Sequence, residues 1–314
     1  MRYFTVPDES ANYFYRPNIG ICKKGMFSAM EPEVIVQGGI DGFGVLRDSG
    51  THIICANENN EIIYIKDNRE PVGILTVKEG VRPYDFTVMS SDGLPDLFYK
   101  VEYDGDILLL RFTVGGSKNP VRVAKLSPEH TEYAAGDEKV FYTNTENVLG
   151  YSDVSLGGTG GFVPLCKGGY MPYYAEFAGN KYLVYLDGNS IFINGEAVVS
   201  DKHALSPVLF RVNDTVYLQW LSGCFVRYMT NSDGVHWSAP MRYIGNGEAP
   251  EMITFVTGNG KISCYGYKGK PFTPGVTAET DNFIRNELGE IQKQVSVLKN
   301  EFKKISSVNY FDKN

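Results

Sequence analysis

Residues 208–244 read VLFRVNDTVYLQWLSGCFVRYMTNSDGVHWSAPMRYI. Four short runs in this stretch are rich in β-branched and aromatic residues, at 208–212, 216–221, 225–230 and 241–244. Asn, Asp, Ser and Gly separate the runs, and these residues favour tight turns. The pattern therefore predicts four short strands that are joined by turns.

The opening strand pair of this stretch recurs along the chain. The six pairs are Phe43–Arg47 with His52–Ala56, Phe86–Met89 with Leu97–Tyr103, Glu132–Ala135 with Val140–Asn144, Tyr174–Phe177 with Tyr182–Leu186, Val208–Val212 with Val216–Leu221, and Met252–Val256 with Ile262–Tyr267. They begin 43, 46, 42, 34 and 44 residues apart, and a period of about 40–50 residues is typical of propeller blades. The sequence predicts an all-β fold, a six-bladed β-propeller over residues 1–274, with five blades as the alternative.

The two ends of this region suggest how the ring closes. The pair that begins at Met252 lacks outer strands, because Pro271-Phe272-Thr273-Pro274 follows it. The segment before Gly38, which includes Glu33–Gln37, has no recognisable repeat of its own. Closure of a ring removes exposed sheet edges. We therefore expect the N-terminal segment to close the ring by completing the last blade.

The sequence changes in kind after Pro274-Gly275. Over residues 279–308 the apolar positions alternate at spacings of four and three, which predicts a coiled-coil helix. The seam residues are Ile284, Leu288, Ile291, Val295, Leu298, Phe302 and Ile305. Ile at d positions with Leu at an a position favours more than two strands, so we expect a trimer. A single helix that packs its apolar stripe on the ring is the alternative.

Composition excludes several functional classes. The 314 residues carry a net charge of −7 and no long Lys/Arg run, which disfavours nucleic-acid binding. The five cysteines and four histidines lack metal-ligand spacing, so we expect free thiols, no metal and no cofactor. The N-terminus has no apolar signal segment, and no apolar stretch reaches the ~18 residues of a membrane span. We expect synthesis in the cytoplasm and no membrane association.

The sequence SDGVHW contains Ser232, Asp233, Gly234 and Trp237. It resembles the Asp-box turn of sialidase-type propellers and the similar turn of arabinanase-like glycosidase propellers. The resemblance implies that Asp233 bonds backbone amides, that Gly234 takes a positive φ, and that Trp237 fills the gap between strands. This role is structural, so the motif points to a fold and not to an activity.

A second resemblance raises the possibility of catalysis. Glu248-Ala249-Pro250 is similar to the Glu-x-Pro element of arabinanase-like glycosidases, in which the glutamate is the general acid. The resemblance implies that Asp41 and Asp85, at the starts of inner strands, supply the other carboxylates for glycoside hydrolysis. The chain departs from that family at Ser206, where the family has an acid.

Other residues are candidates for ligand binding without catalysis. Tyr173 and Tyr174 lead into an inner strand, where exposed rings could stack on sugars. Glu248, Glu251 and Arg82 are further candidates in the neighbouring loops. A ring followed by a coiled coil is similar in layout to receptor-binding or fibre proteins of bacteriophage tails. The layout implies an oligomeric carbohydrate- or receptor-binding component of a tail fibre or baseplate, in contact with other tail proteins. A glycoside hydrolase and a protein-docking hub are the alternatives.

Overall fold

The computed structural model describes an all-β chain, in which every described secondary-structure element is a strand. The described residues are 2–7, 11–16, 18–25, 31–47, 50–66, 69–78, 80–91, 94–116, 119–154, 159–177, 179–212, 214–243, 249–257, 260–267 and 270–271. They belong to one compact unit, Met1–Met26 with Met30–Phe272; the other unit is Phe27–Ala29 with Thr273–Asn314. The expected coiled coil at 279–308 therefore lies outside the described residues.

Five sheets are antiparallel meanders of four consecutive strands. Their strands are β5–β8 (Ile40–Arg47, Gly50–Ala56, Glu61–Lys66, Val72–Thr76), β9–β12 (Pro83–Ser91, Leu94–Tyr103, Asp106–Thr113, Val121–Lys125), β13–β16 (Tyr133–Gly136, Lys139–Thr143, Val148–Asp153, Phe162–Lys167), β17–β20 (Gly169–Phe177, Asn180–Asp187, Ser190–Ile193, Glu196–Ser200) and β21–β24 (Ala204–Val212, Thr215–Ser222, Phe225–Asn231, Met241–Tyr243). Each meander therefore contains one of the strand pairs that the sequence pattern marked.

The sixth sheet has seven strands in the order β27-β26-β25-β1-β2-β3-β4. Its strands are β1 (Arg2–Pro7), β2 (Ala11–Arg16), β3 (Gly20–Gly25), β4 (Glu33–Gln37), β25 (Glu251–Thr257), β26 (Gly260–Tyr267) and β27 (Lys270–Pro271). Two meanders thus share one sheet, because β1 and β25 pair in parallel from Arg2↔Met252 to Thr5↔Phe255.

The N-terminal segment differs from the sequence-based expectation. It has a meander of its own, β1–β4, and it does not supply the outer strands of the pair that begins at Met252. It meets that pair along β25, on the edge opposite β26. The repeat was missed because these strands are rich in Tyr, Lys and Arg, whereas the other meanders are rich in Val and Ile.

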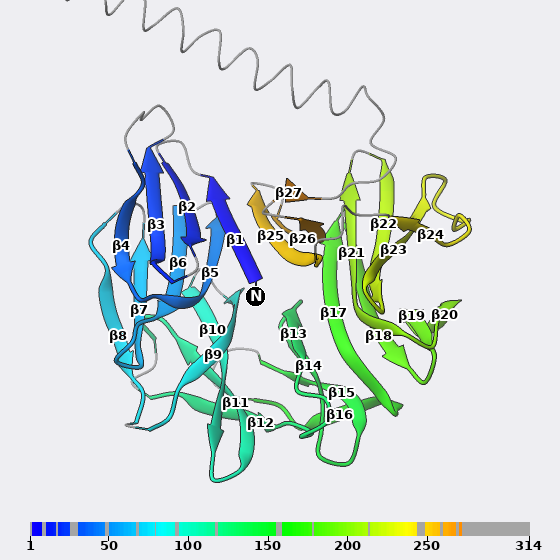
Figure 1. The fold of residues 1–314 in the computed structure, drawn as a ribbon. Coiled ribbons are helices and arrows are strands. Elements are labelled where there is room, and N and C mark those ends of the chain that lie inside the picture. Colours follow the sequence, from blue (N-terminus) through cyan, green and yellow to red (C-terminus); the bar gives the residue numbers. More distant parts are fainter. Residues whose placement is uncertain are drawn as a thin grey trace, which may run out of the picture. The chain divides into compact units, whose positions relative to one another are not determined.

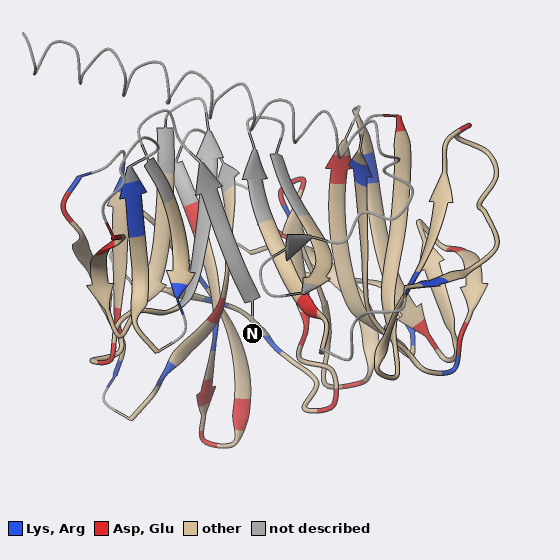
Figure 2. Cartoon of the chain, turned by 45° about the horizontal axis from the view of Figure 1, so that its top comes forward, with Lys and Arg blue, Asp and Glu red and all other residues tan. Residues whose placement is uncertain are grey.

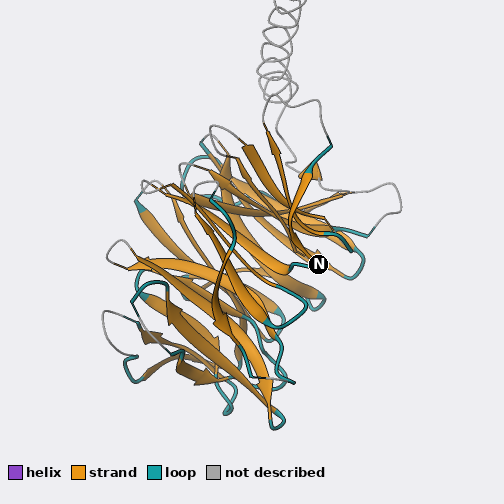
Figure 3. Ribbon diagram, turned by 90° about the vertical axis from the view of Figure 1, so that its left-hand side faces the viewer, coloured by secondary structure: helices purple, strands orange, loops and turns teal. Residues whose placement is uncertain are grey.

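Contacts between first strands arrange the meanders in a ring. β1 contacts β5, and the series continues through β9, β13, β17 and β21 to β26. The parallel pair of β25 with β1 completes the circuit. Figure 1 shows the first strands around the centre and the fourth strands at the periphery, and Figure 3 shows the strands from the side. This arrangement is that of a β-propeller.

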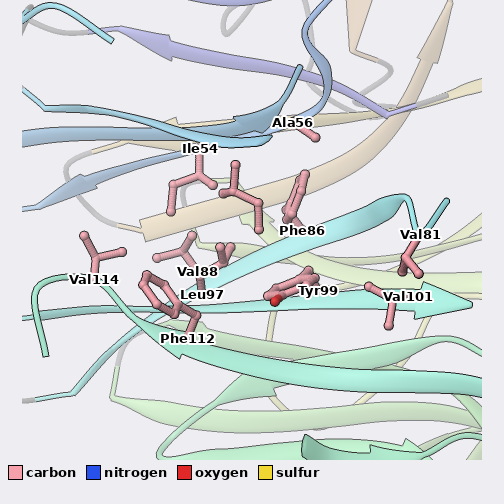
Figure 4. Packing of buried hydrophobic residues seen from close by; sticks show 11 residues of the cluster. Ile54, Ala56, Val81, Phe86, Val88, Leu97, Tyr99, Val101, Phe112 and Val114 are labelled. Atoms are coloured by element: carbon pink, nitrogen blue, oxygen red, sulfur yellow. The ribbon is translucent and has the colours of Figure 1, made fainter. Parts of the chain in front are cut away.

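Apolar side chains fill the spaces between neighbouring sheets. One large cluster joins sheet β5–β8 to sheet β9–β12, and its members include Ile54, Leu97, Tyr99 and Phe112 (Figure 4), together with Ile62. Ile54, Ile62 and Leu97 are completely buried. Burial of one such side chain stabilises a fold by about 1.5–3 kcal/mol. The ring is therefore held together mainly by packing between sheets, besides the hydrogen bonds within them.

The outermost strands of five meanders share a bulge. In each, the register between the third and fourth strands shifts so that the fourth strand carries one extra apolar residue. The extra residues are Ile35, Ile74, Val123, Leu165 and Val198. All except Leu165 pack against an apolar cluster. A bulge interrupts the row of unpaired amide and carbonyl groups that an edge strand presents.

Asp201 anchors the connection between β20 and β21. Its carboxylate accepts hydrogen bonds from the Trp220 indole at 2.9 Å and from the His203 amide at 3.0 Å, and Arg227 Nη1 lies 3.4 Å away. Burial alone would raise the pKa of Asp201, but these donors and the Arg227 charge outweigh it and hold that pKa below its usual value.

Candidate functional site

Four first strands, β5, β9, β17 and β21, share an irregularity near their beginnings. The register advances three residues on the first strand against two on the second, so each first strand carries one extra residue. The bulges lie at Asp41-Gly42, Asp85-Phe86, Met171-Pro172 and Ser206-Pro207. A four-stranded antiparallel meander returns the chain to the end where it began, so these bulges lie at one end of the ring. We name this end, marked by Asp41, Asp85, Met171 and Ser206, the bulged rim.

The backbone of the bulged rim is strained at three described positions. Asp85, Met171 and Ser206 have φ values of 55°, 51° and 45°. The left-handed region is unfavourable for residues other than Gly, and such strain clusters at functional sites. Pro172 and Pro207 follow two of these residues, and proline is tolerated in a sheet at a bulge because it has no amide hydrogen to donate.

Neighbouring sheets brace these bulges. The Tyr133 hydroxyl, from β13, lies 2.5 Å from the carbonyl oxygen of Asp85, in β9. The Tyr265 hydroxyl, from β26, donates to the carbonyl oxygen of Ser206 at 2.6 Å. The Ser206 amide in turn donates to Met171 Sδ at 3.2 Å. Since these bonds cross between sheets, they fix the strained backbone of the rim in place.

Asp85, a candidate catalytic acid from the sequence, takes part in a buried ion pair. Its Oδ2 lies 2.7 Å from Lys100 Nζ, and the two side chains are 14% and 6% exposed. Lys100 also donates to the Thr131 carbonyl oxygen at 3.1 Å, and its ammonium lies 5.2 Å from the Tyr84 ring and 5.9 Å from the Tyr133 ring. The pair therefore joins sheet β9–β12 to the segment that enters β13.

The other candidate acids and tyrosines occupy different places. Asp41 lies in the β5 bulge, although its side chain, like all of Glu248, is outside the described residues. Tyr173, just after the β17 bulge, packs in one cluster with Met252 of β25. Tyr174, one residue further along the strand, stacks on Phe141 instead, with ring centres 5.8 Å apart. The structure thus separates the two tyrosines, because consecutive residues of a strand face opposite sides.

Glu251 and Arg82 both lie at the bulged-rim end. Glu251 is the first residue of β25 and is half-buried. Its Oε2 atom is buried and has no hydrogen-bond partner among the residues that the structure describes. Arg82 is exposed and directly precedes β9.

The Asp-box-like turn lies at the opposite end of the ring, between β23 and β24. Asp233 Oδ1 accepts hydrogen bonds from the Val235 and His236 amides at 2.8 and 2.7 Å. These amides and the His236 ring hold the pKa of Asp233 far below its usual value. Gly234 has a φ of 79°, and Trp237 packs beside the apolar cluster between β17–β20 and β21–β24. Ser232 is exposed. These contacts are those of a structural turn.

Sequence reasoning missed Lys100 and Met171. An available signal for Met171 was a proline at the same place in two repeats, since Pro172 and Pro207 are each the fourth residue of a first strand. Lys100 gave no such signal, because an isolated lysine in an apolar strand does not reveal its partner.

Two kinds of feature are absent from the described residues. These residues contain no group of three or more His, Cys, Asp or Glu side chains that could hold a metal ion. No helix long and apolar enough to cross a membrane occurs in this part of the chain. Figure 2 shows acidic and basic residues interspersed along the drawn strands and loops.

The fold places the described unit among β-propellers. The extracellular domain of BT3049 from B. thetaiotaomicron is similar, with a TM-score of 0.52 and 8% identity over 87% of this chain and 39% of that chain. This likeness concerns the fold alone.

Two further solved structures are β-propeller-like. BBS1N, solved in complex with ARL6DN, has a TM-score of 0.46 and 12% identity over 68% of this chain and 71% of its own. BamB from Moraxella catarrhalis has a TM-score of 0.43 and 14% identity over 75% of this chain and 71% of its own. No family model and no curated protein matches the sequence.

Proposed function

We propose that this protein is a binding β-propeller whose bulged rim recognises a carbohydrate receptor on a bacterial surface. The observation that carries the proposal is the alignment of four bulges at one end of the ring, three of them with a left-handed, non-glycine residue. Bulges redirect side chains, and strain of this kind persists where function requires it. Loops and strand ends on a rigid ring are also where propellers present binding residues.

The ion pair between Asp85 and Lys100 favours binding over glycoside hydrolysis. A hydrolase of the kind that the sequence suggested would use Asp41, Asp85 and Glu248 on a substrate. The Asp85 carboxylate instead contacts the buried ammonium of Lys100 at 2.7 Å, which suits a structural role. A rim that binds a glycan without cleaving it is therefore the stronger proposal.

We further propose that residues 279–308 form a trimeric coiled coil, as the heptad spacing predicts. Three tethered rims would gain avidity of roughly 10²–10⁴ over one rim on a surface with repeated ligands. This organisation would suit a component of a phage or phage-like tail. Light scattering of the full chain and of a chain that ends before residue 279 tests it, and equal protomer numbers would contradict the trimer.

The binding proposal is tested on an array of bacterial surface glycans. The full chain is compared with two rim variants, Arg82→Ser and Glu251→Gln, and with Val235→Ser as the matched control. Val235 is 72% exposed and lies in the turn at the opposite end of the ring. We expect the wild type and the Val235→Ser control to bind one glycan class, and the rim variants to lose about tenfold or more in affinity.

Two results would contradict the proposal. One is a wild-type chain that binds no glycan on the array. The other is a Val235→Ser variant that loses as much affinity as the rim variants. Release of free sugar from a bound glycan, abolished by Glu248→Gln, would instead favour the hydrolase.

A further inference from the structure

We propose that a saccharide subsite lies on the bulged rim between sheets β13–β16 and β17–β20, formed by His130, Tyr170, Glu132 and Asp187. This inference rests on the proposed function and names the part of the rim, and the ligand groups, that carry it. The ligand groups are the hydroxyls and the C–H surface of a neutral sugar ring.

The centre of the subsite is a pair of stacked rings. His130 lies in the loop that enters β13, and Tyr170 is the second residue of β17. Their ring centres are 4.3 Å apart with planes 22° from parallel. Both side chains are half-buried, so the pair forms a fixed aromatic platform that keeps part of its surface open. Aromatic surface of this kind packs against the C–H groups of sugars.

Two carboxylates flank this platform. Glu132 follows His130 by two residues, and Asp187 ends β18 opposite Gly169, the neighbour of Tyr170. Burial raises the pKa of Tyr170, and the Asp187 and Glu132 carboxylates raise it further. Both carboxylates therefore act on the same hydroxyl, which itself donates to the Gly188 carbonyl oxygen over 3.4 Å.

Glu132 carries an acceptor that the described residues leave unused. Its Oε2 atom is buried and has no hydrogen-bond partner among them. A buried carboxylate oxygen without a donor is costly. Rotation of this half-buried side chain toward a ligand hydroxyl would supply the missing donor. Asp187, in contrast, already accepts a hydrogen bond from Cys166 Sγ at 3.3 Å, which orients its carboxylate and leaves capacity for further donors.

The arrangement favours a polyhydroxylated ligand over an amine. An ammonium group has hydrogen-bond donors only, whereas this site also offers the Tyr170 hydroxyl, which can donate as well as accept. A sugar instead needs both acceptors and donors, which the carboxylates, the imidazole and the Tyr170 hydroxyl provide together.

The place of Tyr170 on the bulged rim also supports a binding site here. Tyr170 directly precedes Met171, the strained first residue of the β17 bulge. Met171 Sδ accepts the hydrogen bond from Ser206, so the platform is joined to the bulge of the next sheet. The subsite therefore lies beside a braced bulge of the rim, which favours a preorganised binding site.

The test observes the histidine rings of the full chain by ¹H–¹³C NMR, because the chain has only four histidines. The His130→Gln variant assigns the His130 signal. D-Glucose, D-galactose, N-acetyl-D-glucosamine and L-rhamnose are titrated separately, since one small subsite should bind with a Kd of about 1–10 mM. We expect at least one sugar to shift the His130 signal saturably, while the signals of exposed His203 and His236 stay in place.

Variants and a counter-probe make the result specific. Glu132→Gln should weaken the sugar-induced shift by about tenfold, and the matched control Glu146→Gln, exposed at the same end of the ring, should not. Propylamine at the same pH and concentration serves as the amine probe. The inference is overturned if no sugar moves His130, if propylamine moves it and the sugars do not, or if Glu132→Gln has no effect.

The outcome also separates this inference from the proposed function. If the full chain binds glycans on the array but no sugar moves His130, the binding rim stands and this subsite is wrong. If the chain binds no glycan at all, both proposals are wrong.

Discussion

Removal of the Lys100 ammonium should destabilise the ring strongly. In Lys100→Met the Asp85 carboxylate, which is 14% exposed and lies 2.7 Å from the ammonium in the wild type, loses its contact with that ammonium. Loss of one partner of a buried pair costs about 3–5 kcal/mol, because the remaining charge is left uncompensated. Lys100 also bonds the Thr131 carbonyl oxygen, so the upper part of that range is expected. The free energy of unfolding is measured by urea titration with tryptophan fluorescence. Trp220 serves as the probe because it is fully buried in the folded chain.

The double variant Lys100→Met/Asp85→Asn provides the internal check. Asn retains the shape of Asp and tolerates the left-handed φ of position 85. Neutralising both partners should recover part of the loss, with a coupling of about 1–3 kcal/mol. The matched control is Lys125→Met, since Lys125 and Asp106 also form a 2.6 Å pair but are 49% and 41% exposed. That control should cost about 1 kcal/mol or less.

A loss below about 1 kcal/mol in Lys100→Met, equal to the Lys125→Met control, would refute this reasoning. Such a result would mean that water or a rearranged side chain compensates Asp85. It would also reopen the possibility that Asp85 acts on a substrate, since the carboxylate would then not depend on Lys100.

Three further predictions concern packing, pH and thiols. Leu97→Ala should lower the free energy of unfolding by about 2–5 kcal/mol, because Leu97 is completely buried; a loss under 1 kcal/mol in urea unfolding would argue against the packed inter-sheet core. The pKa of Asp201 is lower in the folded chain than in the unfolded chain, so its stabilisation is fully present above the unfolded pKa of about 4 and is lost as the pH falls through the lower folded pKa; urea unfolding at neutral and at acidic pH should show a smaller acid-induced loss of stability in Asp201→Asn. In native protein at pH 8, a thiol reagent should label exposed Cys224 quickly and leave Cys55 and Cys264 unlabelled, because burial raises the pKa of each to about 12; rapid labelling of all thiols without denaturant would contradict the buried positions.

The strand pattern was predictable wherever Val, Ile and aromatic residues alternate with turn residues. The stretch 208–244 contains β22, β23 and β24 within one residue of the expected bounds, whereas β21 begins four residues earlier than expected, at Ala204. The N-terminal meander was not predictable in this way, because Arg2–Pro7 and Gly20–Gly25 lack that density of β-branched residues. Local sequence also gives no sign that β1 pairs with β25 across almost the whole chain.

The candidate site was predictable only in part. Asp41, Asp85 and Ser206 were singled out as equivalent starts of inner strands, and each lies in a first-strand bulge. The partner of Asp85 could not be foreseen, because ion pairing is set by the register of β9 against β10. The stack of His130 on Tyr170 arises between two sheets, so no spacing along the chain announces it.

The bulged outer strands limit how copies of this ring can meet. Copies held together by a tether experience effective concentrations of about millimolar, at which unprotected strand edges would join sheet to sheet. The extra residues, such as Ile74 and Val123, interrupt those edges in five meanders, and the one four-stranded meander without a bulge there, β21–β24, has a fourth strand of only three residues. The perimeter is consequently a poor template for strand addition, and an extended peptide should not be captured there. Rings that are brought close together would then remain separate binding units.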